Sequence, residues 1–310
     1  MADPAPRLLP FTHDAVVEAA RLIAAGEPVA VPTETVYGLA ADARSADAVA
    51  RIYAAKGRPS FNPLIVHVPD LAAAEALADL DTDAQALARA FWPGPLTLVA
   101  PLRPDAGLAP AVVAGLSTVA IRVPAHRAMR ALLAASAAPL AAPSANRSGH
   151  ISPTRADHVA ASLGAAVPLI LDDGATEAGL ESTIVRGRTI LRPGPVTADD
   201  LAAVLGSTPG ERVGGAITAP GQLPSHYAPV KPLRLDAADA GPDEWLIGFG
   251  PVAGDENLSA KGDPVEAAAH LFAALHRADA GPKPRIAVAP IARAGIGEAI
   301  NDRLRRAAHR

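Results

Sequence analysis

The 310-residue sequence contains no cysteine, and aromatic residues make up only 3% of it. Without cysteine the chain can form no disulfide, no thiolate zinc site and no thiol nucleophile. The scarcity of aromatic side chains argues against a broad stacking platform for single-stranded nucleic acid. The formal net charge is −4, which argues against a protein that holds RNA or DNA by charge alone, so we expect any RNA contact to be weak and local.

Long apolar runs are also missing. The longest uncharged stretches, 106–121 and 131–146, are interrupted by proline or glycine and are too short to span a bilayer. The first ten residues lack the basic stretch and apolar core of a signal peptide. We therefore expect a cytoplasmic protein without a membrane association. A basic run that includes Arg303, Arg305, Arg306 and Arg310 is typical of a solvated helix face.

Several common catalytic motifs are absent. The sequence has no phosphate-binding loop of the form G-x-x-x-x-G-K-[ST], no H-E-x-x-H and no G-x-S-x-G. Its nine histidines show no metal-ligand spacing. We therefore expect no protein-held metal.

Half of the residues are hydrophobic, and helical and extended patterns alternate along the first two-thirds of the chain. This alternation predicts an α/β fold with a twisted, mixed open sheet and helices. We predict helices at 14–25, 45–57, 71–79, 84–91, 125–136, 154–163 and 198–205. We predict strands before Pro32 and at 64–68, 96–100, 118–123, 138–142, 168–172 and 182–186.

A change in composition divides the chain. Residues 207–230 are rich in proline and glycine and indicate a long linker, which is usually functional or joins two domains. We therefore predict a larger α/β domain at 1–206, a linker at 207–230 and a smaller, Rossmann-like α/β domain at 231–310. The last domain has predicted strands at 244–249 and 285–289 and helices at 263–279 and 297–308.

Charged side chains interrupt the apolar strands. Lys56 and Arg58 are spaced i, i+2 beside Gly57, and we expect them to point the same way from an extended loop. Such a pair suits a polyphosphate, although a solvated basic turn is the commoner explanation of one K-x-R. His67 lies inside an apolar strand, where a lone histidine is usually a hydrogen-bonded core residue.

Arg122 lies in the predicted strand 118–123, where a buried guanidinium needs an anion. A substrate carboxylate and an internal salt bridge are equally good candidates for that anion. The segment 143–149 follows a strand and offers Ser144 and Asn146, whose groups suit phosphate or ribose oxygens. Residues 33–35 (Thr-Glu-Thr) end the first strand, and by themselves they indicate a turn.

Taken together, these segments carry a more specific signal. In order, the chain contains PTETVYGL, KGRPSFNPLIVHV, FWPGPLT, STVAIRVP, PLAAPSANRSG, ESTIV and LRPG, and the linker contains PSHYAP. This series resembles the YrdC-like family, and the linker and C-terminal unit resemble those of its two-domain members, the threonylcarbamoyl-AMP synthases. The resemblance covers essentially the whole chain.

The resemblance implies that L-threonine, bicarbonate and ATP give L-threonylcarbamoyl-adenylate and pyrophosphate, with Mg²⁺ on the ATP. A separate tRNA threonylcarbamoyl transferase would use the product to modify tRNA. The family's catalytic tetrad corresponds to Lys56, Arg58, Ser144 and Asn146. The implied ATP-binding residues are Arg58, Asn62, Thr118, Ser144, Ser152, Arg192 and Tyr227. The implied threonine-binding residues are Thr35, His67, Arg122, Ala142 (through its backbone) and Ser182.

Because Tyr227 lies in the linker, we expect the linker to fold over the nucleotide as a lid. Three alternatives remain open: an RNA-binding module without catalysis, a carbamoyl-adenylate-dependent carbamoyltransferase, and a regulatory domain that senses ATP. Related carbamoyltransferases carry acylphosphatase-like and zinc-finger segments that are absent here.

Overall fold

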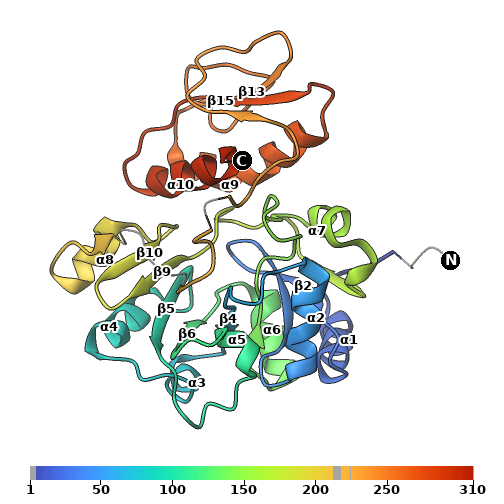
Figure 1. Ribbon diagram of the computed structural model, residues 1–310, viewed down its shortest axis with the longest axis vertical. Coiled ribbons are helices and arrows are strands. Elements are labelled where there is room, and N and C mark those ends of the chain that lie inside the picture. The colour runs from blue at the N-terminus through green and yellow to red at the C-terminus, as the bar shows by residue number, and fades with distance from the viewer. Residues whose placement is uncertain (1–4, 212–217, 224, 310) are drawn as a thin grey trace.

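The computed structural model describes residues 5–211, 218–223 and 225–309. The predicted linker residues Gly214, Gly215 and Pro224, and Arg310 of the basic run, lie outside the described residues. The chain forms a large domain, blue to yellow in Figure 1, and a smaller red and orange domain stacked on it.

The large domain is built on an eleven-stranded sheet with the order β1-β8-β2-β3-β7-β4-β6-β5-β9-β10-β11. The sheet contains parallel pairs such as β4 with β6 and antiparallel pairs such as β6 with β5, which confirms the predicted mixed sheet. The strands are β1 (Arg7–Pro10), β2 (Val29–Pro32), β3 (Tyr37–Asp42), β4 (Ile65–His67), β5 (Leu96–Pro101), β6 (Thr118–Arg122), β7 (Leu140–Ala141), β8 (Leu169–Asp172), β9 (Thr183–Arg186), β10 (Thr189–Arg192) and β11 (Gly210–Glu211).

Helices cover the two faces of this sheet unequally. Helices α2, α3, α5 and α7 share one core with β3, β4 and β6, whereas α1 and α6 pack on the opposite face over β2, β3 and β8. Helices α4 and α8 cover the end formed by β5, β9 and β10. Their bounds are α1 (His13–Ala24), α2 (Ala46–Lys56), α3 (Leu71–Glu75), α4 (Thr82–Phe91), α5 (Pro110–Val113), α6 (Arg127–Ser136), α7 (Ala156–Leu163), the short 3₁₀ helix η1 (Gly164–Ala166) and α8 (Ala198–Leu205).

Local sequence explains where the helices begin. The side chains of Thr12, Ser45, Asp70 and Asp81 each accept a hydrogen bond from a backbone N–H of the first turn of α1, α2, α3 and α4. At α8, Thr197 and Asp200 form a reciprocal capping box. These caps satisfy N–H groups that would otherwise have no partner at a helix start.

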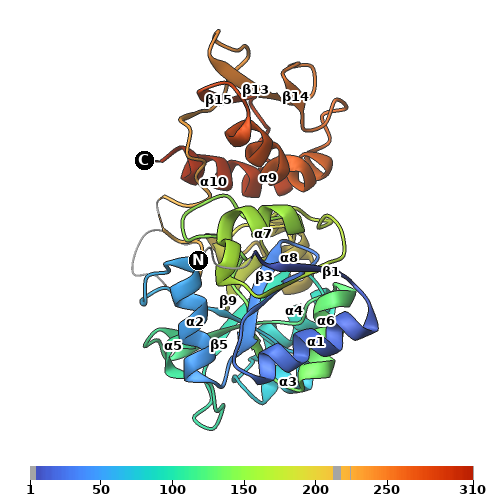
Figure 2. The same cartoon turned by 90° about the vertical axis from the view of Figure 1, so that its right-hand side faces the viewer.

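The small domain has a parallel sheet with the order β12-β15-β13-β14, which confirms the predicted second α/β unit. Its elements are β12 (Leu233–Arg234), β13 (Glu244–Gly248), β14 (Glu256–Asn257), α9 (Pro264–Ala280), β15 (Arg285–Val288) and α10 (Ile296–Ala308). Both helices lie between this sheet and the large domain in the two views of Figures 1 and 2.

The two domains share a buried hydrophobic cluster. Val36, Ile151 and Leu180 of the large domain belong to the same buried cluster as the core of α9 and α10. Gly179 has φ +68°, and a Cβ placed there would lie 2.4 Å from the Ala268 carbonyl oxygen of α9. Only glycine allows this approach without displacing backbone, so the segment that leads into β9 lies directly against the small domain.

One part of the large sheet is left for a ligand. On the face that carries α1 and α6, no helix of the described residues packs over β4, β5, β6 and β9, where Ile65, Ala120 and Ile184 instead form a cluster with Ala219 of the linker. Polar side chains on this face can therefore meet in a cavity between the sheet and the linker.

Candidate active site

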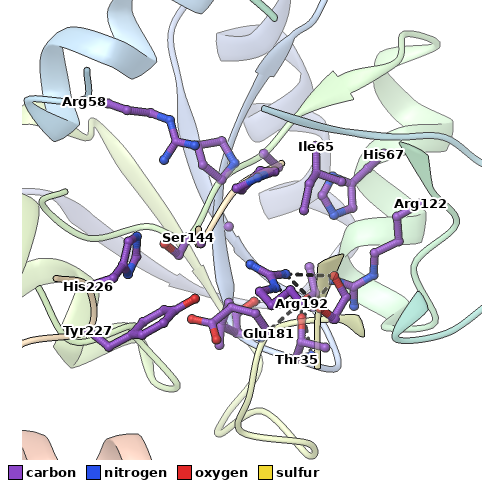
Figure 3. A pocket seen from close by; sticks show the side chains of 18 residues that line it. Thr35, Arg58, Ile65, His67, Arg122, Ser144, Glu181, Arg192, His226 and Tyr227 are labelled. Carbon is purple, nitrogen blue, oxygen red and sulfur yellow. Dashed lines mark hydrogen bonds between the residues drawn. The ribbon is translucent and has the colours of Figure 1, made fainter. Parts of the chain in front are cut away.

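A pocket opens on this part of the sheet, away from α1 and α6, and extends to the linker (Figure 3). The space between its walls is about 550 Å³ when the open solvent at its mouth is included. It is lined by Thr33, Thr35, Val36, Gly38, Arg58, Ile65, His67, Arg122, Ala142, Pro143, Ser144, Glu181, Ser182, Arg192, Pro220, Gly221, His226 and Tyr227. Nine of the predicted site residues are among them, drawn from seven of the motif segments.

Arg122 and His67 stand side by side at one end of the pocket, because β6 and β4 are parallel and these two residues are register partners. The Arg122 guanidinium forms an ion pair with Glu34 at 2.6 Å and donates to Thr35 Oγ1 at 2.9 Å and the Gly94 carbonyl at 3.2 Å. Of the two anions expected for Arg122, the structure therefore shows the internal one, Glu34. An arginine has five N–H donors, so these contacts leave others for a ligand.

Glu34 is held as an anion by its surroundings. Burial alone would raise the pKa of its carboxyl group, but the charge and hydrogen bonding of Arg122 outweigh burial, and the pKa is lowered. Glu34 Oε2 also accepts hydrogen bonds from the backbone N–H groups of Ala125 and His126. The turn at 33–36 is closed by Thr33, whose hydroxyl donates to the Val36 carbonyl. The residues that indicated a turn therefore also build one wall of the pocket.

His67 is neutral at physiological pH. Burial, and then the nearby Arg122 charge, lower the pKa of its imidazole to about 3. Its Nδ1 atom is buried and has no hydrogen-bond partner among the described residues. A neutral imidazole with an open position can exchange a hydrogen bond with a small polar ligand.

The prediction that Lys56 extends from a loop together with Arg58 is wrong. It is the last residue of α2, and Gly57 ends the helix with φ 58° in the left-handed region. Its Nζ atom donates to the carbonyl oxygens of Ser144 at 2.5 Å and Asn146 at 2.6 Å. Lys56 therefore fixes the loop that follows β7 and does not itself line the pocket. Burial and the Arg58 charge lower its pKa well below its usual value.

Arg58 extends from the following loop into the pocket. Some of its surface is exposed, but its guanidinium is surrounded by protein atoms, and this burial lowers its pKa to about 10. It donates to the carbonyl oxygens of Asn62 at 3.0 Å and Pro63 at 2.7 Å. In Figure 3 it lies on the side of the pocket that also holds Ser144, His226 and Tyr227.

Arg192, at the end of β10, occupies the middle of the pocket (Figure 3). It donates to the Ser182 carbonyl at 3.0 and 2.9 Å and to Ser182 Oγ at 3.2 Å. The Ser182 hydroxyl is also 2.7 Å from Thr97 Oγ1 on β5. Burial lowers the pKa of Arg192, so its charge is only partly compensated by these dipoles.

Three cations of the site lack an acidic partner. Among the residues that the structure describes, no carboxylate oxygen lies within 4.0 Å of the charged nitrogens of Lys56, Arg58 or Arg192. Each is instead held by carbonyl oxygens. Buried charges are normally paired, so this arrangement indicates a site that receives an anion.

The linker supplies the remaining wall. Tyr227 is fully buried with φ 62°, and its ring lies 4.1 Å from that of His226. Gly221 has φ +80°, and a Cβ at this position would lie 2.8 Å from the Tyr227 hydroxyl and 2.9 Å from Arg192 Cδ. A side chain at 221 would thus push Tyr227 and Arg192 apart.

Five predicted site residues do not line the pocket: Lys56, Asn62, Thr118, Asn146 and Ser152. Asn146 donates to the carbonyls of Arg147 and His150 and therefore shapes the loop around Ser144. Ser152 donates to Glu181. Asn62 is fully buried, and its side-chain amide has no hydrogen-bond partner among the described residues. Thr118 begins β6, at the opposite end of the strand from Arg122.

Sequence reasoning did not assign roles to Glu34, Glu181 and His226, although each lies in a segment that it singled out. It was wrong about Arg303: this residue is fully buried rather than part of a solvated helix face, and it forms ion pairs with Glu181 and Asp302. No local spacing could have revealed that contact, because Glu181 is 122 residues away in sequence.

Comparison with known proteins agrees with this geometry. A family profile described as telomere recombination matches residues 21–194, and one described as the C-terminal domain of threonylcarbamoyl-AMP synthase matches 196–309. The threonylcarbamoyl-AMP synthase of Pyrococcus abyssi is 39% identical over 319 residues, 93% of this chain and 92% of that protein. The chain belongs to the threonylcarbamoyl-AMP synthase family.

Further relatives support this assignment. The family member from Bacillus subtilis is 46% identical over 233 residues, 71% of this chain and 66%, just under two thirds, of that protein. The crystal structure of P. abyssi Sua5 complexed with L-threonine matches with a TM-score of 0.90 and 35% identity, and the match covers 97% of each chain. This similarity confirms the predicted fold class and the likeness to the two-domain members.

Two further properties concern the described part of the chain. None of its helices has both the length and the apolar character needed to cross a membrane. Its His, Asp and Glu side chains form no group of three or more that could hold a metal ion. Glu181, the acid among the pocket-lining residues, is engaged by Arg303 and Ser152.

Proposed function

We propose that this family member is the enzyme that condenses L-threonine, bicarbonate and ATP into L-threonylcarbamoyl-adenylate and pyrophosphate, the first step of tRNA threonylcarbamoyladenosine modification. The observation that carries the proposal is that Arg58 and Arg192 line one pocket without an acidic partner among the described residues, with Lys56 buried behind its wall. The opposite side, with Arg122, His67 and Thr35, suits a small zwitterion. The relative solved with L-threonine supports that choice.

The reaction needs no nucleophile from the protein. The neutral amine of threonine adds to carbon dioxide formed from bicarbonate, and the product is a carbamate. A carbamate oxygen then attacks the α-phosphorus of ATP, and the bond between the α-phosphorus and the bridging oxygen breaks to release pyrophosphate. Such a reaction is accelerated by positioning and by stabilisation of negative charge.

The residues divide between the two substrates. Arg122 offers its remaining N–H groups to the threonine carboxylate, while the hydroxyls of Thr35 and Ser182 contact the rest of threonine. His67 and the backbone of Ala142 complete that side, and the Ala142 N–H already donates to the Ile65 carbonyl at 3.0 Å.

Arg58 and Arg192 contact the phosphates on the other side, and Lys56 and Asn146 hold Ser144 in place beside them. Asn62, Thr118, Ser152 and Tyr227 are the further ATP-binding residues that we propose. Mg²⁺ enters with ATP as part of the substrate and is held mainly by phosphates and water. We assign the domains as 1–206, 207–230 and 231–310, with the linker as a lid over the nucleotide.

The direct test is to incubate the pure protein with ATP, Mg²⁺, bicarbonate and each amino acid in turn. Mass spectrometry should detect a carbamoyl-adenylate adduct only with threonine, together with one pyrophosphate per product. ATP binding without pyrophosphate release would favour the ATP sensor, and product formation from carbamoyl phosphate would favour the carbamoyltransferase. RNA binding without any turnover would favour the RNA-binding module. Transfer to tRNA by a separate transferase would complete the proposal.

A further inference from the structure

Arg303 is a residue of the small domain that reaches into the site of the large one. It lies on α10 and is 0% exposed. Its Nε donates to Glu181 Oε2 at 2.8 Å, its NH2 group to the Glu181 carbonyl at 3.4 Å, and its NH1 group to Asp302 at 2.9 Å. This is the charged contact through which α10 engages the wall of the pocket.

Glu181 is the pocket-lining residue that Arg303 holds. It is 6% exposed, and its other carboxylate oxygen accepts a hydrogen bond from the Ser152 hydroxyl. The next residue, Ser182, accepts the hydrogen bonds of Arg192. Glu181 is also close enough to Lys56 and Arg192 to interact with them electrostatically. A Glu181 carboxylate without Arg303 would therefore repel phosphate oxygens or compete with them for these cations.

Arg303 also contacts the linker. Its guanidinium carbon lies 5.2 Å from the centre of the Tyr227 ring, within the range of a cation–π contact. The neighbouring Arg306 donates to the Leu223 carbonyl at 2.7 Å, and its own carbonyl oxygen accepts from the His226 N–H at 3.3 Å. Helix α10 thus holds the linker segment that leads into Tyr227.

We propose that Arg303 is a positioning residue for the ATP side of the site: it withdraws Glu181 from the phosphates and holds Tyr227 beside Arg192. The inference rests on the proposed function for the identity of the anion. The small domain would thus contribute to nucleotide binding through Arg303, which does not touch the reacting atoms. Most of the threonine side lies away from it, because Arg122, His67 and Thr35 have no contact with Arg303 among the described residues, and of that side only Ser182 adjoins Glu181.

The test compares Arg303→Met with Arg305→Met, a control on the same helix whose side chain is exposed. We measure KM for ATP and for threonine, and the Kd for ATP by calorimetry. Arg303→Met should raise KM and Kd for ATP at least tenfold and change KM for threonine less than twofold. Arg303→Lys, which keeps the charge but not the planar fork, should recover part of the loss. Arg305→Met should match the wild type.

A double variant keeps the test valid if Arg303→Met folds poorly because Glu181 is left buried without a cation. Glu181→Gln/Arg303→Met removes both charges and should bind ATP more tightly than Arg303→Met. Wild-type ATP affinity in folded Arg303→Met, or an equal rise in both KM values, would overturn the inference, as would a double variant no better than the single one. Calorimetry needs no turnover, so it tests Arg303 even if threonine-dependent synthesis fails in the wild type.

Discussion

Replacing Arg58 with alanine separates the ligand-binding role of a buried cation from any structural role. The guanidinium has no acidic partner within 4.0 Å among the described residues, and it donates to two carbonyl oxygens, those of Asn62 and Pro63. Losing one charge-assisted contact to a developing anion costs about 3 kcal/mol, which corresponds to roughly a hundredfold in rate. We therefore expect Arg58→Ala to lower kcat/KM for ATP by about two orders of magnitude.

The same variant should fold normally. It loses two hydrogen bonds, worth about 1 kcal/mol each, but it also removes the cost of burying a charge that no acid compensates. These terms oppose each other, so the free energy of unfolding should change by about 1 kcal/mol or less and the Tm by only a few degrees.

Ligand-induced stabilisation gives the second measurement. At an ATP concentration about 100 times its Kd, the wild-type protein gains roughly 2.7 kcal/mol of unfolding free energy. A variant whose Kd is about a hundredfold higher gains only about 0.4 kcal/mol at the same concentration. The assays are pyrophosphate release and thermal unfolding with and without ATP, and exposed Arg130→Ala on α6 is the control. Wild-type turnover in Arg58→Ala would refute the argument from uncompensated charge.

Two further predictions concern the other walls of the pocket. Glu34→Gln leaves the buried Arg122 without its anion and should cost about 3–5 kcal/mol of unfolding free energy, measured by urea denaturation. Because the folded-state pKa of Glu34 is lowered from 4.5, its stabilisation is fully present above about that pH and is lost on acidification, so the wild type should lose more stability than Glu34→Gln as the pH falls. For the linker, ATP plus threonine should slow chymotrypsin cleavage after Tyr227; equal cleavage with and without ligands would contradict the lid.

The sequence predicted the fold well where hydrophobic periodicity was strong. It predicted β4, β5, β6, β8 and β9 within two residues, but it missed β3 (Tyr37–Asp42) and β1 (Arg7–Pro10). The β3 segment, YGLAAD, contains glycine and alanine, which are uncommon in strands, and tertiary packing between β2 and β7 decides its conformation. Family membership, which rested on the order of several motifs, is confirmed.

The site was less accessible to local reasoning. The predicted helix 45–57 already included Lys56, with Gly57 as the usual signal of a helix end; the expectation that Lys56 extends with Arg58 from a loop was the mistake. The ion pairs of Arg122 with Glu34 and of Arg303 with Glu181 join distant segments, and no periodicity encodes which acid a buried arginine will meet. The roles assigned to the ATP-binding and threonine-binding residues, and the domain boundaries, stay predictions.

The contact between α10 and Glu181 has a consequence for the order of folding. Its two residues are separated by 122 positions, and such long-range contacts close a large loop and form late. The large domain can therefore reach its native topology with the nucleotide side of its pocket still unfinished. Competence for ATP should then appear in a slower kinetic phase than secondary structure, as the small domain docks.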